Sequence, residues 1–358
     1  MIVLEDLLTS LVERGGSDLH ISAGSPPKFR LDGELIDAAH EPLKSEETKR
    51  LVYSILNAEQ IARFEKDLEL DLSFGITGLG RFRTNVFQQR GAVSGVFRVI
   101  PYEIQGFKEL GLPVEICKNI CSIPKGLVLV TGATGSGKST SLASMIDEIN
   151  QHRRQHIVTI EDPIEFLHVN KKSLFNQREV GADTFAFERA LKSVLRQDPD
   201  VVLIGELRTL ETIEAALTLA ETGHLTFATL HTSDCVQTIN RIVDVFPANQ
   251  QQQVRTQLSF TLQAVFCQQL IPTADGRGRT LACEIMIANS AVKALIRENK
   301  AHQIYSQIQT GGSLGMQTMN MALNELYQTR KISLDEALTR STDKEDLKRL
   351  VSKQPALR

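Results

Sequence analysis

The sequence of 358 residues has no CxxC pair, no long apolar run and no large excess of either charge. Its cysteines are scattered along the chain, which argues against both a zinc site and a disulfide framework. We expect reduced thiols that mostly fill the core. The five cysteines are Cys117, Cys121, Cys235, Cys267 and Cys283.

No apolar run approaches the roughly 18 residues that a membrane-spanning helix needs. The first six residues, MIVLED, place acids where a signal peptide carries bases. We therefore expect a cytoplasmic protein. The formal net charge of −3 gives the average surface no strong attraction for nucleic acid or anionic lipid. The length indicates two domains or three.

The most informative stretch is GATGSGKST, residues 132–140, which fits the phosphate-binding P-loop. Apolar residues 127–131 predict a strand before it, and apolar residues at helical spacing within 142–149 predict a helix after it. Backbone N–H groups of such a loop surround a phosphate chain, and the helix N-terminus adds partial positive charge. We expect Lys138 to reach the outer phosphates of a nucleoside triphosphate and Ser139 to hold Mg²⁺. The expected nucleotide-binding residues are Gly132, Ala133, Thr134, Gly135, Ser136, Gly137, Lys138, Ser139 and Thr140.

The first hundred residues predict a small α+β domain with an antiparallel sheet. A helical stripe of leucines begins at Leu4, and alternating runs predict strands, with Asp32-Gly33 as a hairpin turn. Residues 45–65 predict one helical stretch. Pro101 marks the end of this domain, 1–100, and residues 101–112 are interpreted as a linker.

From residue 113 onwards, short apolar runs alternate with helical patterns, which predicts a mainly parallel sheet covered by helices. The expected strands are residues 127–131, 156–160, 201–204 and 225–230. We assign this α/β core to residues 113–290. Residues 291–358 are predicted to be a C-terminal helical portion.

Ligands of a parallel α/β sheet bind at the carboxyl ends of its strands, so the residues after each apolar run are candidates. Glu206 follows the strand 201–204, and a carboxylate there orders magnesium or its waters in P-loop enzymes. A solvated or helix-capping acid is the alternative. Residues 161–165, EDPIE, offer three carboxylates, one of which can serve as general base for an attacking water. A purely structural acidic turn is the alternative.

His224 and His231 flank the strand 225–230, which places them about 20 Å apart at its two ends. We expect His231, at the carboxyl end, to lie near the phosphates. His224 is expected at an interface or a neighbouring loop, or as a simply satisfied core group.

Three arginines of the first domain are candidates for sensing the γ-phosphate. Arg81 and Arg83 share one face of a strand because side chains alternate, and Arg98 lies on the next strand. If they reach the nucleotide, hydrolysis changes the attraction between domains. Solvated strand-face charges are the alternative.

Taken together, four motifs resemble the Walker A, Asp box, Walker B and His box of the type II/type IV secretion ATPase superfamily. They are residues 132–139, 160–165, 200–208 and 221–231. Their order and spacing match as well. The resemblance covers nearly the whole chain and is strongest with the ATPases that retract type IV pili. It implies a hexameric ring of RecA-like P-loop cores with PAS-like N-terminal domains and C-terminal helices.

The resemblance also implies roles and surroundings. Lys138 and Ser139 would bind phosphate and magnesium, Glu165 would be the general base, and Glu206 the Walker B acid and magnesium residue. The remaining implied site residues are the His-box pair His224 and His231 and the arginines Arg81, Arg83 and Arg98. ATP and Mg²⁺ are the implied cofactors, without zinc or nucleic acid. The implied place is the cytoplasmic base of a pilus, peripheral to the inner membrane, on a platform protein, with a paralogous retraction ATPase as an open possibility.

The sequence departs from the family pattern in three places. Thr209 replaces a usual Asp; it can still cap the next helix but removes a charge. Val292-Lys293-Ala294 replaces Ile-Arg-Asn in the C-terminal retraction motif. The four-cysteine zinc insertion of the extension and type II secretion ATPases is missing. Three alternatives stay open: an accessory retraction or pilus-assembly ATPase, a non-hydrolysing scaffold, and a nucleic-acid translocase.

Overall fold

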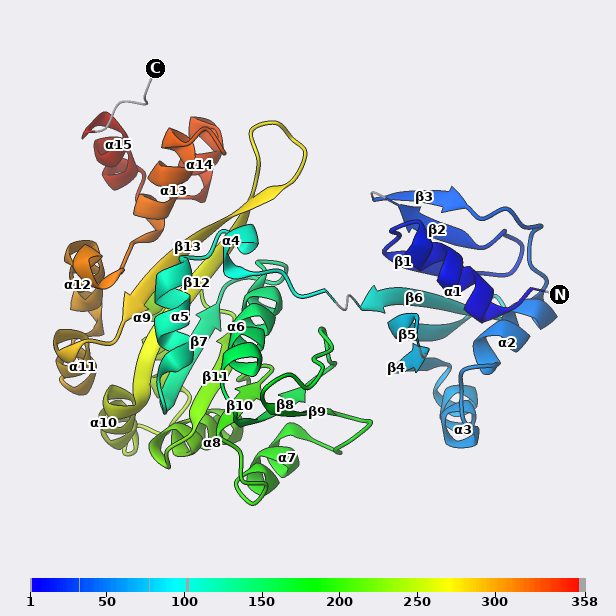
Figure 1. Cartoon of the computed structure of the whole chain (residues 1–358), viewed down its shortest axis with the longest axis horizontal. Helices are drawn as coiled ribbons and strands as arrows, with labels where there is room; N and C mark the ends of the chain where they lie inside the picture. Colours follow the sequence, from blue (N-terminus) through cyan, green and yellow to red (C-terminus); the bar gives the residue numbers. More distant parts are fainter. Residues whose placement is uncertain (1, 32, 77, 101–102, 354–358) are drawn as a thin grey trace. The chain divides into compact units, whose positions relative to one another are not determined.

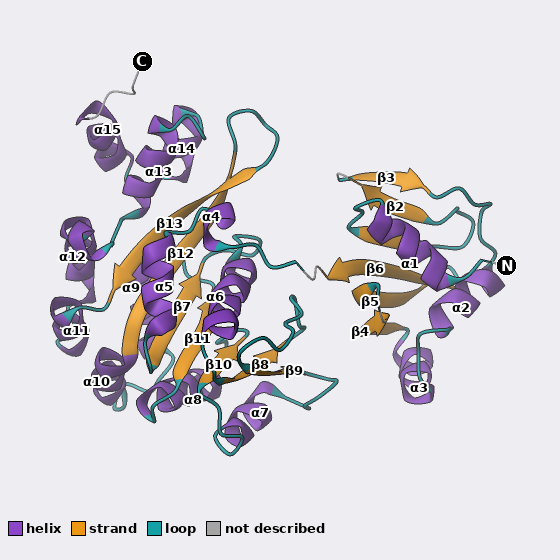
Figure 2. Ribbon diagram, in the orientation of Figure 1, coloured by secondary structure: helices purple, strands orange, loops and turns teal. Residues whose placement is uncertain are grey.

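The computed structural model describes residues 2–31, 33–76, 78–100 and 103–353 (Figures 1 and 2). Asp32 of the expected hairpin turn and Pro101 of the expected domain boundary lie outside this range. The chain divides into two compact units, Met1–Glu103 with Glu165–Leu167, and Ile104–Ile164 with His168–Arg358. Among the described residues, no helix has the length and apolar character needed to cross a bilayer.

The first unit contains an antiparallel sheet with the strand order β3-β2-β1-β6-β5-β4. Apolar side chains of α1 and of the strands meet in one core, in which Leu8, Phe29 and Phe97 are fully buried. The elements are α1 (Leu4–Glu13), β1 (Asp18–Ile21), β2 (Lys28–Leu31), β3 (Glu34–Asp37), α2 (Ser45–Tyr53), α3 (Ala58–Asp67), β4 (Glu69–Ile76), β5 (Gly80–Gln89) and β6 (Ala92–Ile100).

Residues 45–65 do not form the single helical stretch that we expected, because Asn57 starts a new helix. Its side chain accepts a hydrogen bond of 2.9 Å from the N–H of Gln60, and the Gln60 side chain accepts one of 2.9 Å from the N–H of Asn57. This reciprocal capping box separates α2 from α3. Strand β4 is a further element that the sequence analysis missed.

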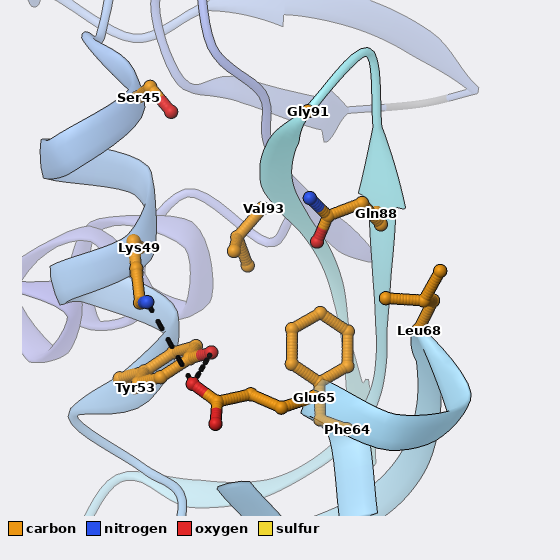
Figure 3. Close-up of a pocket in the computed structure, with 9 residues that line it drawn as sticks. All are labelled: Ser45, Lys49, Tyr53, Phe64, Glu65, Leu68, Gln88, Gly91 and Val93. Carbon is orange, nitrogen blue, oxygen red and sulfur yellow. Dashed lines mark hydrogen bonds and ion pairs between the residues drawn. The ribbon is translucent and has the colours of Figure 1, made fainter.

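A pocket of the first unit lies among α2, α3, β5 and β6 (Figure 3). Three of its polar side chains contact one another. The Tyr53 hydroxyl donates a 3.2 Å hydrogen bond to Glu65 Oε1, and Lys49 Nζ lies 3.9 Å from the same oxygen. Lys49 Nζ also lies 4.8 Å from the centroid of the Tyr53 ring. Because these groups satisfy one another, we assign no ligand to this pocket.

The second unit is built on a sheet with the order β13-β12-β7-β11-β10-β8-β9. All neighbouring pairs are parallel except β12 with β13. The α/β fold class is thus confirmed. The strands are β7 (Gly126–Thr131), β8 (His156–Glu161), β9 (Leu174–Glu179), β10 (Val201–Ile204), β11 (Leu225–Leu230), β12 (Leu262–Pro272) and β13 (Arg279–Ile287). The sequence predicted β7, β8, β10 and β11, but not the other three.

Helices cover both faces of this sheet (Figure 2). Along β7, Leu127 and Leu129 pack in the core under α7–α12, whereas Val128 and Val130 pack in the core under α4–α6. A third apolar cluster joins α13–α15 to the sheet. The helices are α4 (Phe107–Leu110), α5 (Val114–Ser122), α6 (Lys138–His152), α7 (Phe187–Val194), α8 (Leu210–Glu221), α9 (Cys235–Asp244), α10 (Gln251–Thr261), α11 (Ser290–Arg297), α12 (Ile304–Thr310), α13 (Met319–Gln328), α14 (Leu334–Arg340) and α15 (Lys344–Lys353).

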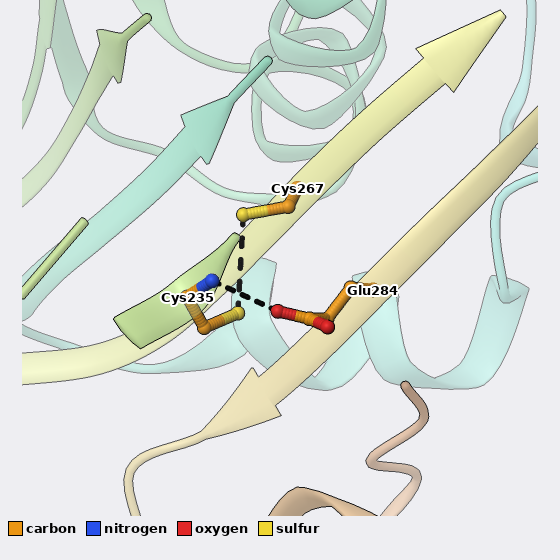
Figure 4. Close-up of side chains that lie close together, drawn as sticks. All are labelled: Cys235, Cys267 and Glu284. Atoms are coloured by element: carbon orange, nitrogen blue, oxygen red, sulfur yellow. Dashed lines mark hydrogen bonds between the residues drawn. The ribbon is translucent and has the colours of Figure 1, made fainter. Parts of the chain in front are cut away.

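The buried carboxylate of Glu284 ties two helices to β13, and Figure 4 shows its contact with Cys235 of α9. One oxygen accepts the N–H of Cys235, the first residue of α9, at 2.8 Å, and the other accepts the N–H of Met319, the first residue of α13, at 3.3 Å. A carboxylate is favourable at helix N-termini.

The sulfurs of Cys235 and Cys267 lie 3.9 Å apart beside Glu284. Two thiols and a carboxylate are ligand types that zinc uses. However, burial raises the pKa of Cys235 well above its usual value, and both carboxylate oxygens of Glu284 already accept backbone hydrogen bonds. We therefore interpret the cluster as a structural junction. All five cysteines are buried free thiols, as expected.

Replacing Glu284 with Ala should loosen both helix N-termini, because it leaves two buried N–H groups without acceptors. We expect a loss of about 2–5 kcal/mol in the free energy of unfolding, with faster hydrogen exchange at Cys235 and Met319. Glu214→Ala, at an exposed position of α8, is the matched control and should change stability by less than about 0.5 kcal/mol. Unchanged exchange at both amides would contradict this interpretation.

Candidate nucleotide site

The P-loop connects β7 to α6 through three glycines whose backbone angles disfavour other residues. Gly132, Gly135 and Gly137 have φ angles of 139°, 77° and 88°. A Cβ atom on Gly132 would lie only 2.4 Å from the backbone oxygen of Gln268. The exposed residues 133–135 lie just before the N-terminus of α6, where backbone N–H groups without helical acceptors can bind a phosphate chain.

Two buried polar side chains belong to this loop. Lys138 Nζ donates hydrogen bonds to the backbone oxygens of Gly132, at 2.9 Å, and of Ala133, at 3.0 Å. The buried Ser136 Oγ has no hydrogen-bond partner among the described residues. An ammonium group, a hydroxyl and free N–H groups together fit a polyphosphate. The half-buried Ser139 adds a hydroxyl oxygen, a ligand type that suits Mg²⁺.

The register of the parallel strands brings the predicted motifs to one edge of the sheet. Thr131 of β7 pairs with Leu230 of β11, and Ile204 of β10 pairs with both Ala228 of β11 and Ile160 of β8. The P-loop, the Glu206 segment, the EDPIE segment and His231 all follow these strand ends. The predicted placement of these motifs at one edge of the sheet is thus observed.

Glu206 lies in a small charged network at this edge. Arg208 Nη2 donates a 2.7 Å hydrogen bond to Glu206 Oε2, and His231 Nε2 lies 3.3 Å from Glu206 Oε1. Partial burial by itself raises the pKa of Glu206, but the hydrogen bond and charge of Arg208, together with His231, bring it below its usual value. Glu206 is therefore ionised at neutral pH, as a residue that orders Mg²⁺ or its waters must be.

The EDPIE segment contains both engaged and exposed carboxylates. Glu161 Oε1 accepts hydrogen bonds from Thr159 Oγ1 at 2.6 Å and from Gln177 Nε2 at 3.1 Å. Asp162 and Glu165 are exposed. Of the three carboxylates, Glu161 thus has a structural role, and the exposed pair retains the capacity to act on a water.

His224 lies at the opposite end of β11 from His231. Its Nδ1 lies 3.0 Å from the backbone oxygen of Leu219 and 3.1 Å from Thr222 Oγ1, within the turn between α8 and β11. The described chain therefore does not bring His224 to the edge that carries the P-loop, and its catalytic role stays a prediction.

The three candidate arginines lie together within the first unit. Arg83 and Arg98 are directly opposed on β5 and β6. Arg98 Nε lies 2.8 Å from Asp18 Oδ1, and Arg81 Nη2 donates a 2.9 Å hydrogen bond to Ser73 Oγ. Arg83 is exposed. Their reach to a nucleotide stays a prediction.

The departures from the family pattern have visible local effects. Thr209 is the N-cap of α8, and its side chain accepts a hydrogen bond of 3.4 Å from the N–H of Thr212, so the predicted capping role is confirmed. Val292 is fully buried on α11, so the apolar position of the C-terminal motif is kept.

Sequence reasoning missed several buried polar residues around the site. Gln268 Nε2 donates a 2.7 Å hydrogen bond to Ser141 Oγ of α6. Asn150, also on α6, and Glu179, at the end of β9, both bond to the segment that follows β8. The available signal was a polar residue at a core-facing position, since Asn150 lies four residues after the buried Ile146 on the same helix.

His168 is a half-buried residue of the segment that follows β8. Its ring stacks on Phe175 with a centroid distance of 4.4 Å. Burial lowers the pKa of His168 to about 4; Asp147 opposes this shift and Lys171 adds to it. The imidazole is therefore neutral at physiological pH.

Comparisons with known proteins agree with this geometry. The family model of the type II/IV secretion system proteins matches residues 1–351. The "Type IV pilus retractation ATPase PilT" of Pseudomonas aeruginosa is 51% identical, over 93% of this chain and 96% of that protein. The type IV pilus ATPase PilU of the same organism is 42% identical, over 97% and 91%. A crystal structure of the pilus retraction motor PilT with bound ADP matches with a TM-score of 0.91 at 49% identity, covering 98% of this chain and all of that one.

Acid should weaken the fold through His168. A proton binds the unfolded chain, with the usual pKa of 6.5, more readily than the folded one, so stability present above pH 6.5 is lost as pH falls towards 4. Between pH 8 and pH 5, the unfolding free energy of the wild type should fall by about 2 kcal/mol more than that of His168→Phe. Denaturant unfolding at both pH values measures this. Equal losses in the two proteins would contradict the buried neutral imidazole.

Proposed function

Because the chain belongs to the type II/IV secretion system protein family, whose members include pilus ATPases, we propose that this ATPase is a hexameric motor that retracts a type IV pilus. The close similarity to PilT over nearly the whole of both chains carries this proposal. The P-loop and the charged network at the same edge of the sheet supply the residues that ATP hydrolysis requires.

Nucleotide binding is assigned to the turn between β7 and α6. On binding, the phosphates would take over the ammonium group of Lys138 from the backbone oxygens that it now contacts. Residues 132–140 would donate N–H and hydroxyl groups, and Mg²⁺ would be held by Ser139 and by Glu206 or its waters. The ion, when bound, neutralises charge that develops on the phosphates.

Hydrolysis requires a base that orients the attacking water, and we assign this role to Glu165. Glu206 stays ionised through Arg208 and His231. Because His231 contacts Glu206, the position of His231 would depend on the contacts that this Walker B carboxylate makes. The arginines Arg81, Arg83 and Arg98 would respond to the γ-phosphate, and His224 would act at an interface; both assignments follow the family resemblance.

The proposed assembly is a ring of six copies at the cytoplasmic face of the inner membrane, where domain motion driven by ATP acts on a platform protein. The order in which the six subunits hydrolyse ATP is left open.

A second candidate function is that of an accessory retraction ATPase. Two observations favour this second function: the 42% identity to PilU and the altered residues Val292-Lys293-Ala294 of the C-terminal motif.

Lys138→Ala should abolish ATP hydrolysis, because it removes the buried ammonium group that would face the phosphates. We expect phosphate release to fall at least about 100-fold. Lys118→Ala, at an exposed position of α5, should retain wild-type turnover. A Lys138 variant that hydrolyses ATP at the parental rate would rule out the motor, and a preparation that stays monomeric with nucleotide would rule out the ring.

Deleting the gene should leave cells densely piliated but without twitching motility, because pili would extend and not retract. Pilus counts by electron microscopy and motility assays measure both traits. Complementation by Lys118→Ala, but not by Lys138→Ala, should restore movement. Bald cells would indicate an extension motor, and piliated cells with residual retraction would indicate the accessory role.

A further inference from the structure

Asn150 connects α6 to the segment that follows β8. The residue is fully buried. Its Nδ2 donates a 2.8 Å hydrogen bond to the backbone oxygen of Val169, and its Oδ1 accepts one of 3.1 Å from the N–H of Lys171. Its own backbone oxygen accepts one of 2.9 Å from the N–H of Lys172. One residue of α6 therefore holds three consecutive peptide units of this segment in a single register.

An ion pair reinforces this attachment one turn earlier on α6. Lys171 Nζ lies 2.7 Å and 2.8 Å from the two carboxylate oxygens of the buried Asp147. Gln151 Nε2 donates a further 2.6 Å hydrogen bond to Asp147 Oδ2. Asp147 is buried although Lys171 is exposed, so breaking the pair would leave a buried carboxylate without its cation.

Strand β9 fixes the same segment at two earlier points. The N–H of Ile164 donates a 3.2 Å hydrogen bond to Glu179 Oε2, and the N–H of His168 donates one of 2.8 Å to Gln177 Oε1. Residues 165–167 lie between these two anchors. The backbone on both sides of residues 165–167 is therefore hydrogen-bonded to β9.

We propose that Asn150 is a positioning residue for ATP hydrolysis, because it fixes the segment that presents Glu165 to the helix whose N-terminus holds the phosphates. This inference rests on the proposed role of Glu165 as general base. Helix α6 runs from Lys138 to His152, so a rigid stretch of about 18 Å separates Lys138 from Asn150. Displacing a reacting group by about 1 Å can lower a rate about 100-fold.

The test compares kcat and KM for ATP in Asn150→Ala with those of the wild type. We expect kcat to fall about 10–100-fold, with KM changed less than about twofold, because the phosphate-binding loop is untouched. Asn150→Asp keeps the acceptor for the N–H of Lys171 but places an oxygen where the donor to the Val169 oxygen stood, so its kcat should stay low. Lys171→Met, which retains the backbone bonds to Asn150, should lower kcat by a smaller factor and guards against misfolding of the Asn150 variants.

Asn320→Ala is the matched control. Asn320 is equally a buried asparagine; its Nδ2 donates to the backbone oxygen of Asp343 at 2.9 Å and to Asp346 Oδ2 at 2.8 Å, and its Oδ1 accepts from Ser341 Oγ at 2.7 Å. It joins the C-terminal helices to one another. We expect Asn320→Ala to reduce stability as Asn150→Ala does while leaving kcat unchanged. This difference separates the positioning of Glu165 from a general loss of packing.

A double variant decides whether Asn150 acts through Glu165. Glu165→Gln combined with Asn150→Ala should be no more than about twofold slower than Glu165→Gln alone. Multiplied losses, an unchanged kcat in Asn150→Ala, or an unchanged kcat in Glu165→Gln would each overturn the inference. The proposed function is tested separately by Lys138→Ala. A negative result for Asn150 therefore does not contradict the proposal that the protein is a retraction motor.

Discussion

The parallel pairing of β7, β11, β10 and β8 is the constraint on which the rest of the second unit depends. Each of these strands is buried on both faces, as the alternation of Leu127 and Val128 between two cores illustrates. Polar side chains are costly along such strands unless they are paired, so they concentrate just beyond the strand ends. Because the register aligns those ends, four motifs that are distant in sequence meet at one edge.

Electrostatics at this edge follow from what lies beside each charge. Lys138 is buried, and its ammonium group donates hydrogen bonds to the backbone oxygens of Gly132 and Ala133. Glu206, in contrast, has both Arg208 and His231 within hydrogen-bonding or ion-pairing distance. Glu206 therefore stays charged at the edge of the sheet that also carries the P-loop.

The features that the sequence predicted are those with local causes. The P-loop glycines, the strand ends before Glu206 and His231, and the Thr209 cap all depend on neighbours within a few residues. Contacts that join distant segments could not be predicted in this way: Glu284 bonding to both α9 and α13, and strands β9, β12 and β13. The break between α2 and α3 was predictable, because Asn57 and Gln60 form a capping box at the spacing of that motif.

The buried polar residues around α6 belong to the contacts that sequence reasoning missed. An apolar side chain at position 150 would leave the backbone oxygen of Val169 and the N–H of Lys171 without their present partners, so an asparagine there serves these polar groups as well as packing. What an asparagine adds is directionality: its donor and acceptor fit only one register of the segment 169–172. Since that segment continues from Glu165, and α6 begins at Lys138, the helix has one end suited to the phosphates and another that fixes the segment bearing the proposed base. A rigid helix with polar contacts at both ends can hold the phosphate-binding loop and the segment that bears the proposed base at a constant distance while the rest of the chain moves.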